Sequence, residues 1–84
     1  MTDRYWISNA KASTANTAGN WNTVADGTGS TGVPAASDDV YFGHADTLAA
    51  NLGNGACVWN LALTLGRMIT TNEYVGFTHT ATNI

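Results

Sequence analysis

The sequence predicts a mainly β domain, which is either a small β-sheet or β-sandwich or the first rungs of a β-helix, with a long N-terminal loop. Short runs of aromatic and β-branched residues are bounded by polar residues, as is typical of strands. One run of ten residues alternates strictly between apolar and polar positions. Thr, Ala, Asn and Gly, with 13, 13, 9 and 9 copies, fill most of the rest. Glycine and asparagine at this level indicate many turns.

The chain of 84 residues is read as one small domain, 1–84, because a second domain would need more residues. Leu, Ile, Val and Phe together number only 15, so the core is small. We therefore expect the domain to be completed by a partner, by a homo-oligomer or by more chain. The alternation of Thr78, Thr80 and Thr82 runs on to Ile84 without a turn, which predicts that 1–84 is an N-terminal fragment.

The charge balance excludes several classes of partner. Three basic residues stand against six acidic ones, so no basic stripe is available for nucleic acid or for an anionic membrane. The N-terminus has no apolar signal-peptide core, and no segment approaches 18 consecutive apolar residues. We expect neither export nor membrane insertion. Cys57 is the single cysteine; it cannot form an internal disulfide and is expected to be a small buried hydrophobe.

The N-terminal half combines one strand with a long polar segment. Tyr5, Trp6 and Ile7 predict a short strand at the edge of a sheet. Residues 10–37 are Ala, Ser, Thr, Asn and Gly with one aromatic residue, Trp21. Twenty-eight loop residues are unusual in so small a domain. This segment is therefore either an ordered Ω-type loop pinned by Trp21 or partly mobile.

Further strands follow the loop. Asp38–Phe42 predicts a second strand, and residues 47–52 alternate with leucines on one face. The ten-residue run begins at Ala56 and predicts a strand with one buried face. That face carries Cys57, Trp59, Leu61, Leu63 and Leu65. Met68–Thr70 and Tyr74–Thr80 predict two more strands.

The dipeptide Asn54-Gly55 leaves the architecture open. It lies between two alternating runs and favours a type I′ hairpin, because both residues tolerate positive φ. The alternative is a parallel β-helix, in which each strand stacks on the next coil.

Three patterns that resemble sites of chemistry are weak. The run Gly27–Gly32 matches G-x-G-x-x-G, but it neither follows a strand nor opens a helix, as a nucleotide site requires. Ser37 lacks the surroundings of a nucleophile elbow. A third group has ligand types for a divalent ion without the spacing of a closed site: Asp38, Asp39, His44 and Asp46. We predict no catalytic, metal or cofactor site, and hence no enzyme.

Tryptophans and amides also suggest sugar binding, in which an aromatic face stacks on a pyranose ring. Trp59 lies within the leucine face and is expected in the core. Trp21 is the candidate platform for a glycan. The reading of Trp21 as a buried loop anchor is favoured, because a long loop needs a buried side chain to be ordered.

Four segments together resemble a stretch common near the start of bacteriophage virion proteins and bacterial surface β-helix proteins. They are Tyr5-Trp6-Ile7, Gly19-Asn20-Trp21-Asn22, Val33-Pro34 and Ser37-Asp38-Asp39-Val40-Tyr41-Phe42. In that family Y-W is followed by G-N-W, a Gly/Ser/Thr loop, V-P-x-x-S-D-D-V and Thr- and Leu-rich rungs. The second tryptophan that often follows G-N-W is replaced here by residues 24–27.

The resemblance implies a structural, trimeric, mainly β module at the N-terminus of a phage appendage or capsid-surface protein. It also implies that Asp38 accepts backbone N–H groups in a turn and that Val40 and Phe42 face the core. We therefore expect the anchoring domain of a head or tail fibre, or a capsid decoration protein. Such a protein is assembled in the host cytoplasm and attaches to other virion proteins. Strand edges at Tyr5-Trp6-Ile7 and in the strands after Gly66 are the expected contact sites. The alternative is a carbohydrate-binding module of a tailspike or adhesin that uses Trp21.

Overall fold

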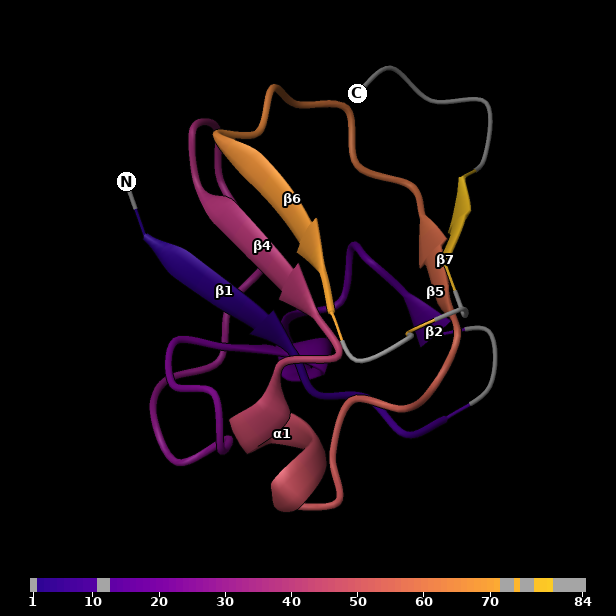
Figure 1. The fold of residues 1–84 in the computed structure, drawn as a ribbon. Helices are drawn as coiled ribbons and strands as arrows, with labels where there is room; N and C mark the ends of the chain where they lie inside the picture. Colours follow the sequence, from indigo (N-terminus) through magenta and orange to yellow (C-terminus); the bar gives the residue numbers. More distant parts are fainter. Residues whose placement is uncertain (1, 11–12, 72–73, 75–76, 80–84) are drawn as a thin grey trace.

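The computed structural model describes residues 2–10, 13–71, 74 and 77–79. Seven short strands, one 3-10 turn and one short helix make up the secondary structure of these residues (Figure 1). In chain order they are β1 (Asp3–Trp6), β2 (Ser13–Thr14), η1 (Ala18–Asn20), β3 (Trp21–Asn22), β4 (Asp39–Phe42), α1 (Ala45–Ala49), β5 (Cys57–Trp59), β6 (Arg67–Thr70) and β7 (Phe77–His79). The prediction of a mainly β fold is confirmed.

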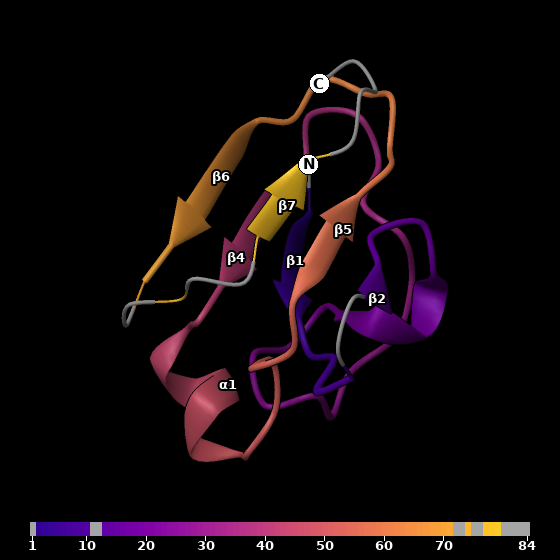
Figure 2. The ribbon, with the colours of Figure 1, turned by 90° about the vertical axis from the view of Figure 1, so that its right-hand side faces the viewer.

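The strands form two sheets that the chain visits in turn. One sheet has the order β3-β1-β4-β6 and the other the order β2-β5-β7. The pairs β1/β4, β4/β6, β2/β5 and β5/β7 are all parallel. The chain thus makes three coils, β1 to β2, β4 to β5 and β6 to β7, each stacked on the one before (Figures 1 and 2). Parallel stacking of successive coils is the pattern of β-helix rungs. Of the two arrangements left open at Asn54-Gly55, the structure therefore has stacked coils and not a hairpin.

The register of the four-stranded sheet lines up side chains across the coils. Asp3 pairs with Asp39, and Asp39 with Arg67. Two residues further along each strand, Tyr5 pairs with Tyr41 and Tyr41 with Ile69. These two columns lie on the outer face of the sheet, because Cβ atoms alternate between faces and the intervening residue of β4 is buried in the core.

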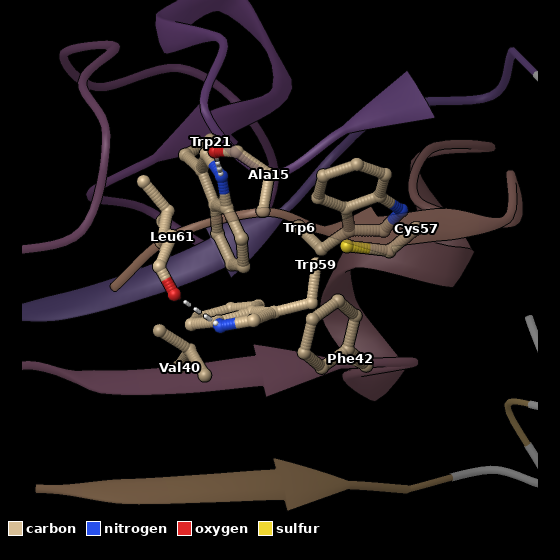
Figure 3. Close-up of a cluster of buried hydrophobic side chains, with 8 residues drawn as sticks. All are labelled: Trp6, Ala15, Trp21, Val40, Phe42, Cys57, Trp59 and Leu61. Carbon is tan, nitrogen blue, oxygen red and sulfur yellow. Dashed lines mark hydrogen bonds between the residues drawn. The ribbon is translucent and has the colours of Figure 1, made fainter. Parts of the chain in front are cut away.

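The core fills the space between the two sheets (Figure 3). Its fully buried aromatic members are Trp6 from β1, Trp21 from β3, Phe42 from β4 and Trp59 from β5. Their rings pack at centroid distances of 5.1 to 6.3 Å, mostly edge to face. Such pairs are favourable beyond the area that they bury. The remaining members are Ala15, Val40, Cys57 and Leu61.

All three indole N–H groups donate to a backbone carbonyl. Trp6 donates to Gly55 at 2.9 Å, Trp21 to Ala15 at 2.8 Å, and Trp59 to Leu61 at 3.0 Å. A buried polar group without a partner costs free energy, so these bonds make a core with three tryptophans tolerable. They also tie the core rings to loops rather than to strands.

Two predicted strands are corrected. Residues 47–52 are not a strand, because residues 45–49 form the helix α1, whose first turn is capped by the His44 Nδ1 atom accepting from the Asp46 N–H at 3.1 Å. The run that begins at Ala56 is a strand only at Cys57–Trp59. Its parallel neighbours have two and three residues, so no ladder exists to extend it. In the part of the chain that the structure describes, no helix has the length and hydrophobicity needed to cross a bilayer.

Candidate functional site

The predicted contact strand lies inside its sheet. β1 is flanked by β3 on one side and by β4 on the other, so the prediction of an edge strand at Tyr5, Trp6 and Ile7 is wrong. The physical reason is that Trp21 and Asn22 fold back as β3 and cover β1. The side chain of Trp6 has no exposed surface and therefore cannot contact a partner. Tyr5 and Ile7 are half-buried.

Tyr5 belongs to an aromatic cluster on the outer face. Its ring stacks on that of Tyr41 at a centroid distance of 4.8 Å and an interplanar angle of 17°. The ring of His44 lies nearly perpendicular to both tyrosine rings, at interplanar angles of 86° and 83°. Burial, and then the nearby carboxylate of Asp3, raise the pKa of Tyr5 above its ordinary value. The cluster joins the first two coils, because Tyr5 comes from β1 and Tyr41 from β4.

Trp21 is buried, and the prediction of a glycan platform at this residue is wrong. Its side chain has no exposed surface, and it contacts the rings of Trp6, Phe42 and Trp59. A sugar cannot stack on a ring whose faces and edges are already packed. The favoured prediction, a buried anchor for the long loop, is confirmed.

Trp21 and Asn22 organise the loop that closes one end of the stack. The side-chain amide of the buried Asn22 accepts N–H groups of Val24 and Gly29 at 2.9 Å and donates to carbonyls of Gly27 and Gly29 at 3.3 Å. The G-x-G-x-x-G run is thus wrapped around an asparagine side chain. The Asn20 amide donates to the Thr14 carbonyl at 2.9 Å and so occupies an acceptor of β2. We call this region, residues 15–32, the closed end.

The side chains of the four candidate metal ligands, Asp38, Asp39, His44 and Asp46, make separate contacts. Asp38 accepts the N–H groups of Thr2 at 2.9 Å and Ala35 at 2.8 Å, and its Oδ2 lies 3.7 Å from the Arg4 Nε atom. Burial acts to raise the pKa of Asp38, but these hydrogen bonds and the charge of Arg4 outweigh it and hold the pKa below its ordinary value. The implied role of Asp38 as an acceptor of turn N–H groups is confirmed.

Asp39 and the other members of the cluster point to different partners. The Asp39 Oδ2 atom accepts from Arg67 Nη2 at 3.1 Å and Nε at 3.3 Å. His44 caps α1, and Asp46 lies in the first turn of that helix. Within the residues described, no group of three histidine, cysteine or acidic side chains is arranged to hold a metal ion.

An open hollow lies between the closed end and the short helix. Its volume is about 370 Å³, and its lining is mostly small or apolar. The lining residues are Val24, Ala25, Asp26, Asp46, Ala49 and Ala50. The Asp26 carboxylate is already bound by the hydroxyl of Thr28 at 2.6 Å and by its N–H at 3.2 Å. These hydrogen bonds stabilise the turn at residues 26–28, and they do not identify a ligand for the hollow.

Cys57 packs in the core, as predicted. Its side chain is fully buried between the two sheets. Burial raises the pKa of its thiol to about 12. A thiol in this state is a poor nucleophile and metal ligand, because both roles require the thiolate.

The strands β6 and β7 form the other end of the stack. Each is the last strand of its sheet, and no described strand pairs with its outer side. We call these two outer sides the open edge; Figure 2 shows both strands at that end of their sheets. Arg67 stands at the start of the open edge with a side chain that is 67% exposed. The strands after Gly66, which are expected to contribute to docking, are the strands that lie at this edge.

Comparisons with known proteins give no match to this chain: no family model, no curated protein sequence and no solved structure is similar to it.

Proposed function

We propose that the chain is a structural module of a phage virion that acts by attaching to another virion protein. The observation that carries the proposal is the difference between the two ends of the stack. One end is closed by β3 and a loop held on Asn22, whereas β6 and β7 leave an open edge in both sheets. In stacked-repeat folds each repeat buries its faces against its neighbours, and terminal repeats act as caps. An end without a cap is therefore one on which a further strand can stack.

The motif resemblance supports the virion part of the proposal. Its residues build the closed end and the adjoining coil: Trp6 and Trp21 pack together, Asp38 holds the preceding turn, and Val40 and Phe42 are fully buried. These residues stabilise the fold by core packing and by hydrogen bonding in a turn. A structural role of this kind is expected of them in an anchoring domain or decoration protein. We propose a trimer on the resemblance alone.

Carbohydrate binding through Trp21 is not carried forward, because that residue has no exposed surface.

The test is to determine which fractions of a lysate contain the chain. Particles from the source culture are purified on a density gradient, and the fractions are probed with an antibody to the chain. We expect the chain to sediment with the particles and to stay with them when salt rises from roughly 0.05 to 0.5 M, because apolar and backbone contacts are not screened as exposed charge pairs are. If the chain stays in the particle-free fractions, the virion assignment is wrong.

Two matched variants connect this test to the structure. Ile69→Lys places a charge on β6 at the open edge, and Ala18→Lys places the same charge on the exposed η1 turn of the closed end. Lysine on an edge strand opposes pairing with another strand. We expect only the Ile69 variant to lose incorporation into particles. Equal incorporation of both variants would show that the open edge is not the attachment surface.

A further inference from the structure

We propose that the open edge binds an extended segment of a partner protein, which adds a strand parallel to β6 and places an acidic residue opposite Arg67. The inference rests on the proposed attachment function and names the surface and the chemistry that it would use. It holds or fails independently of whether the partner belongs to a virion.

Three neighbouring strands of the four-stranded sheet run parallel to one another. β1 pairs with β4, and β4 with β6, all parallel and with Asp3, Asp39 and Arg67 in one row. β6 therefore offers its outer side in the geometry that the two preceding strands have used. Peptides that add to a sheet edge gain affinity from such main-chain bonds and specificity from alternate side chains.

Burial decreases across the sheet toward β6. Val40 and its partner Met68 occupy the same row, but Val40 is fully buried whereas Met68 is only half-buried. Met68 packs against the core, as do the half-buried Leu63 and Leu65 in the connection to β6. A fifth strand with an apolar residue opposite Met68 would bury this remaining surface, which is a favourable change.

Arg67 specifies the charge of the incoming residue. Its Nε and Nη2 groups donate to Asp39 in the preceding coil, and its side chain is nonetheless 67% exposed. A guanidinium has five donors in a planar fork, so Arg67 retains donors for a second carboxylate. An aspartate in the next strand would repeat the Asp39–Arg67 pairing on the opposite side.

A second copy of the chain fits this edge less well. At the closed end the terminal strand of the sheet is β3, which runs antiparallel to β1 and has only two residues. Head-to-tail stacking of copies would therefore not continue the parallel ladder of the four-stranded sheet. Between a second copy and a different protein, the edge at β6 favours a strand from a different protein.

The test uses a peptide probe that copies the strand already paired with β6. The peptide SDDVYFG has the sequence of residues 37–43 and carries an aspartate for the row of Arg67, a valine for that of Met68 and a tyrosine for that of Ile69. With an N-terminal fluorophore, its anisotropy is titrated with the full 84-residue chain, while near-ultraviolet circular dichroism monitors the packing of the tryptophans. We expect saturable binding, and no saturable binding of a scrambled peptide.

Charge reversal then tests the role of Arg67. Arg67→Glu should weaken binding of SDDVYFG about two- to fivefold, as is typical of an exposed ion pair, and the peptide SDRVYFG should regain this loss. Ala18→Glu, which adds a negative charge at the closed end, should change the affinity of neither peptide. Folding of the chain on addition of the peptide would also support the proposal. Equal binding of the scrambled peptide, indifference to Arg67→Glu, or self-association of the chain that excludes the peptide would each overturn it.

Discussion

Trp6 and Tyr74 donate hydrogen bonds to the same acceptor, the carbonyl oxygen of Gly55, at 2.9 and 2.8 Å. Trp6 belongs to the first coil, Gly55 precedes β5 of the second, and Tyr74 follows β6 of the third. One carbonyl therefore links all three coils. The Gly55 position itself admits no side chain, because a Cβ atom there would lie 2.3 Å from the carbonyl oxygen of Ala10.

This shared acceptor gives the first prediction. Tyr74→Phe should lower the free energy of unfolding by about 1 kcal/mol, since one half-buried hydrogen bond is lost while the ring can still stack on Phe42. Tyr41→Phe is the control, because the stacking of its ring on Tyr5 does not need the hydroxyl. Urea denaturation followed by tryptophan fluorescence measures both. A loss at Tyr41 as large as that at Tyr74 would contradict the assignment.

The second prediction concerns the leucine face. Leu61 is only 7% exposed, whereas Leu63 is half-buried. Leu61→Ala should cost about 2 to 5 kcal/mol through lost burial and the cavity left behind, and Leu63→Ala should cost clearly less. Chemical denaturation of the two variants compares them directly. Equal costs would indicate that Leu63 is covered by an oligomer contact.

The third prediction follows from the pKa of Asp38. Because its folded-state pKa lies below the ordinary value of 3.8, the carboxylate contributes stability that is present above pH 3.8 and is lost as the pH falls through the folded-state pKa. Asp38→Asn should lower the free energy of unfolding at pH 7. It should also reduce the loss of stability at low pH, which is the acid limb of the stability curve. Thermal melts from pH 2 to 7 test it. An unchanged acid limb in the variant would show that other carboxylates are responsible.

The fourth prediction concerns the thiol of Cys57. With a pKa near 12 and full burial, it should not react with a thiol reagent at pH 8 in the folded protein and should react at once in strong denaturant. Absorbance after addition of a disulfide reagent reports both states. Rapid labelling without denaturant would mean that the core opens readily.

The fifth prediction concerns all three tryptophans. Trp6, Trp21 and Trp59 have no exposed surface, so their emission should be blue-shifted and weakly quenched by iodide. Simple sugars should leave the spectrum unchanged. A sugar-dependent shift in emission would reopen carbohydrate binding, at a site other than the one that Trp21 was predicted to form.

Several features of the fold follow from local pattern alone. Alternation correctly placed Cys57 and Trp59 on a buried face, because side chains of a strand point to opposite sides at each step. The polar loop with a single aromatic residue correctly predicted that Trp21 anchors it, since ordering a long loop requires buried area. The acceptor role of Asp38 and the burial of Val40 and Phe42 came from the motif resemblance.

Other features were decided by the tertiary structure. The alternation at residues 47–52 gave way to a helix, because that segment pairs with no neighbouring strand and His44 caps its first turn. Nothing within Tyr5-Trp6-Ile7 indicates whether a strand is central or at an edge. The strand β1 is central because β3, which begins fifteen residues after the end of β1, pairs with its free side. The choice between hairpin and stacked coils, and with it the open edge at Arg67, depends on pairings between segments far apart in the chain. Local alternation has the same period in both arrangements, so only the assembled sheets distinguish them.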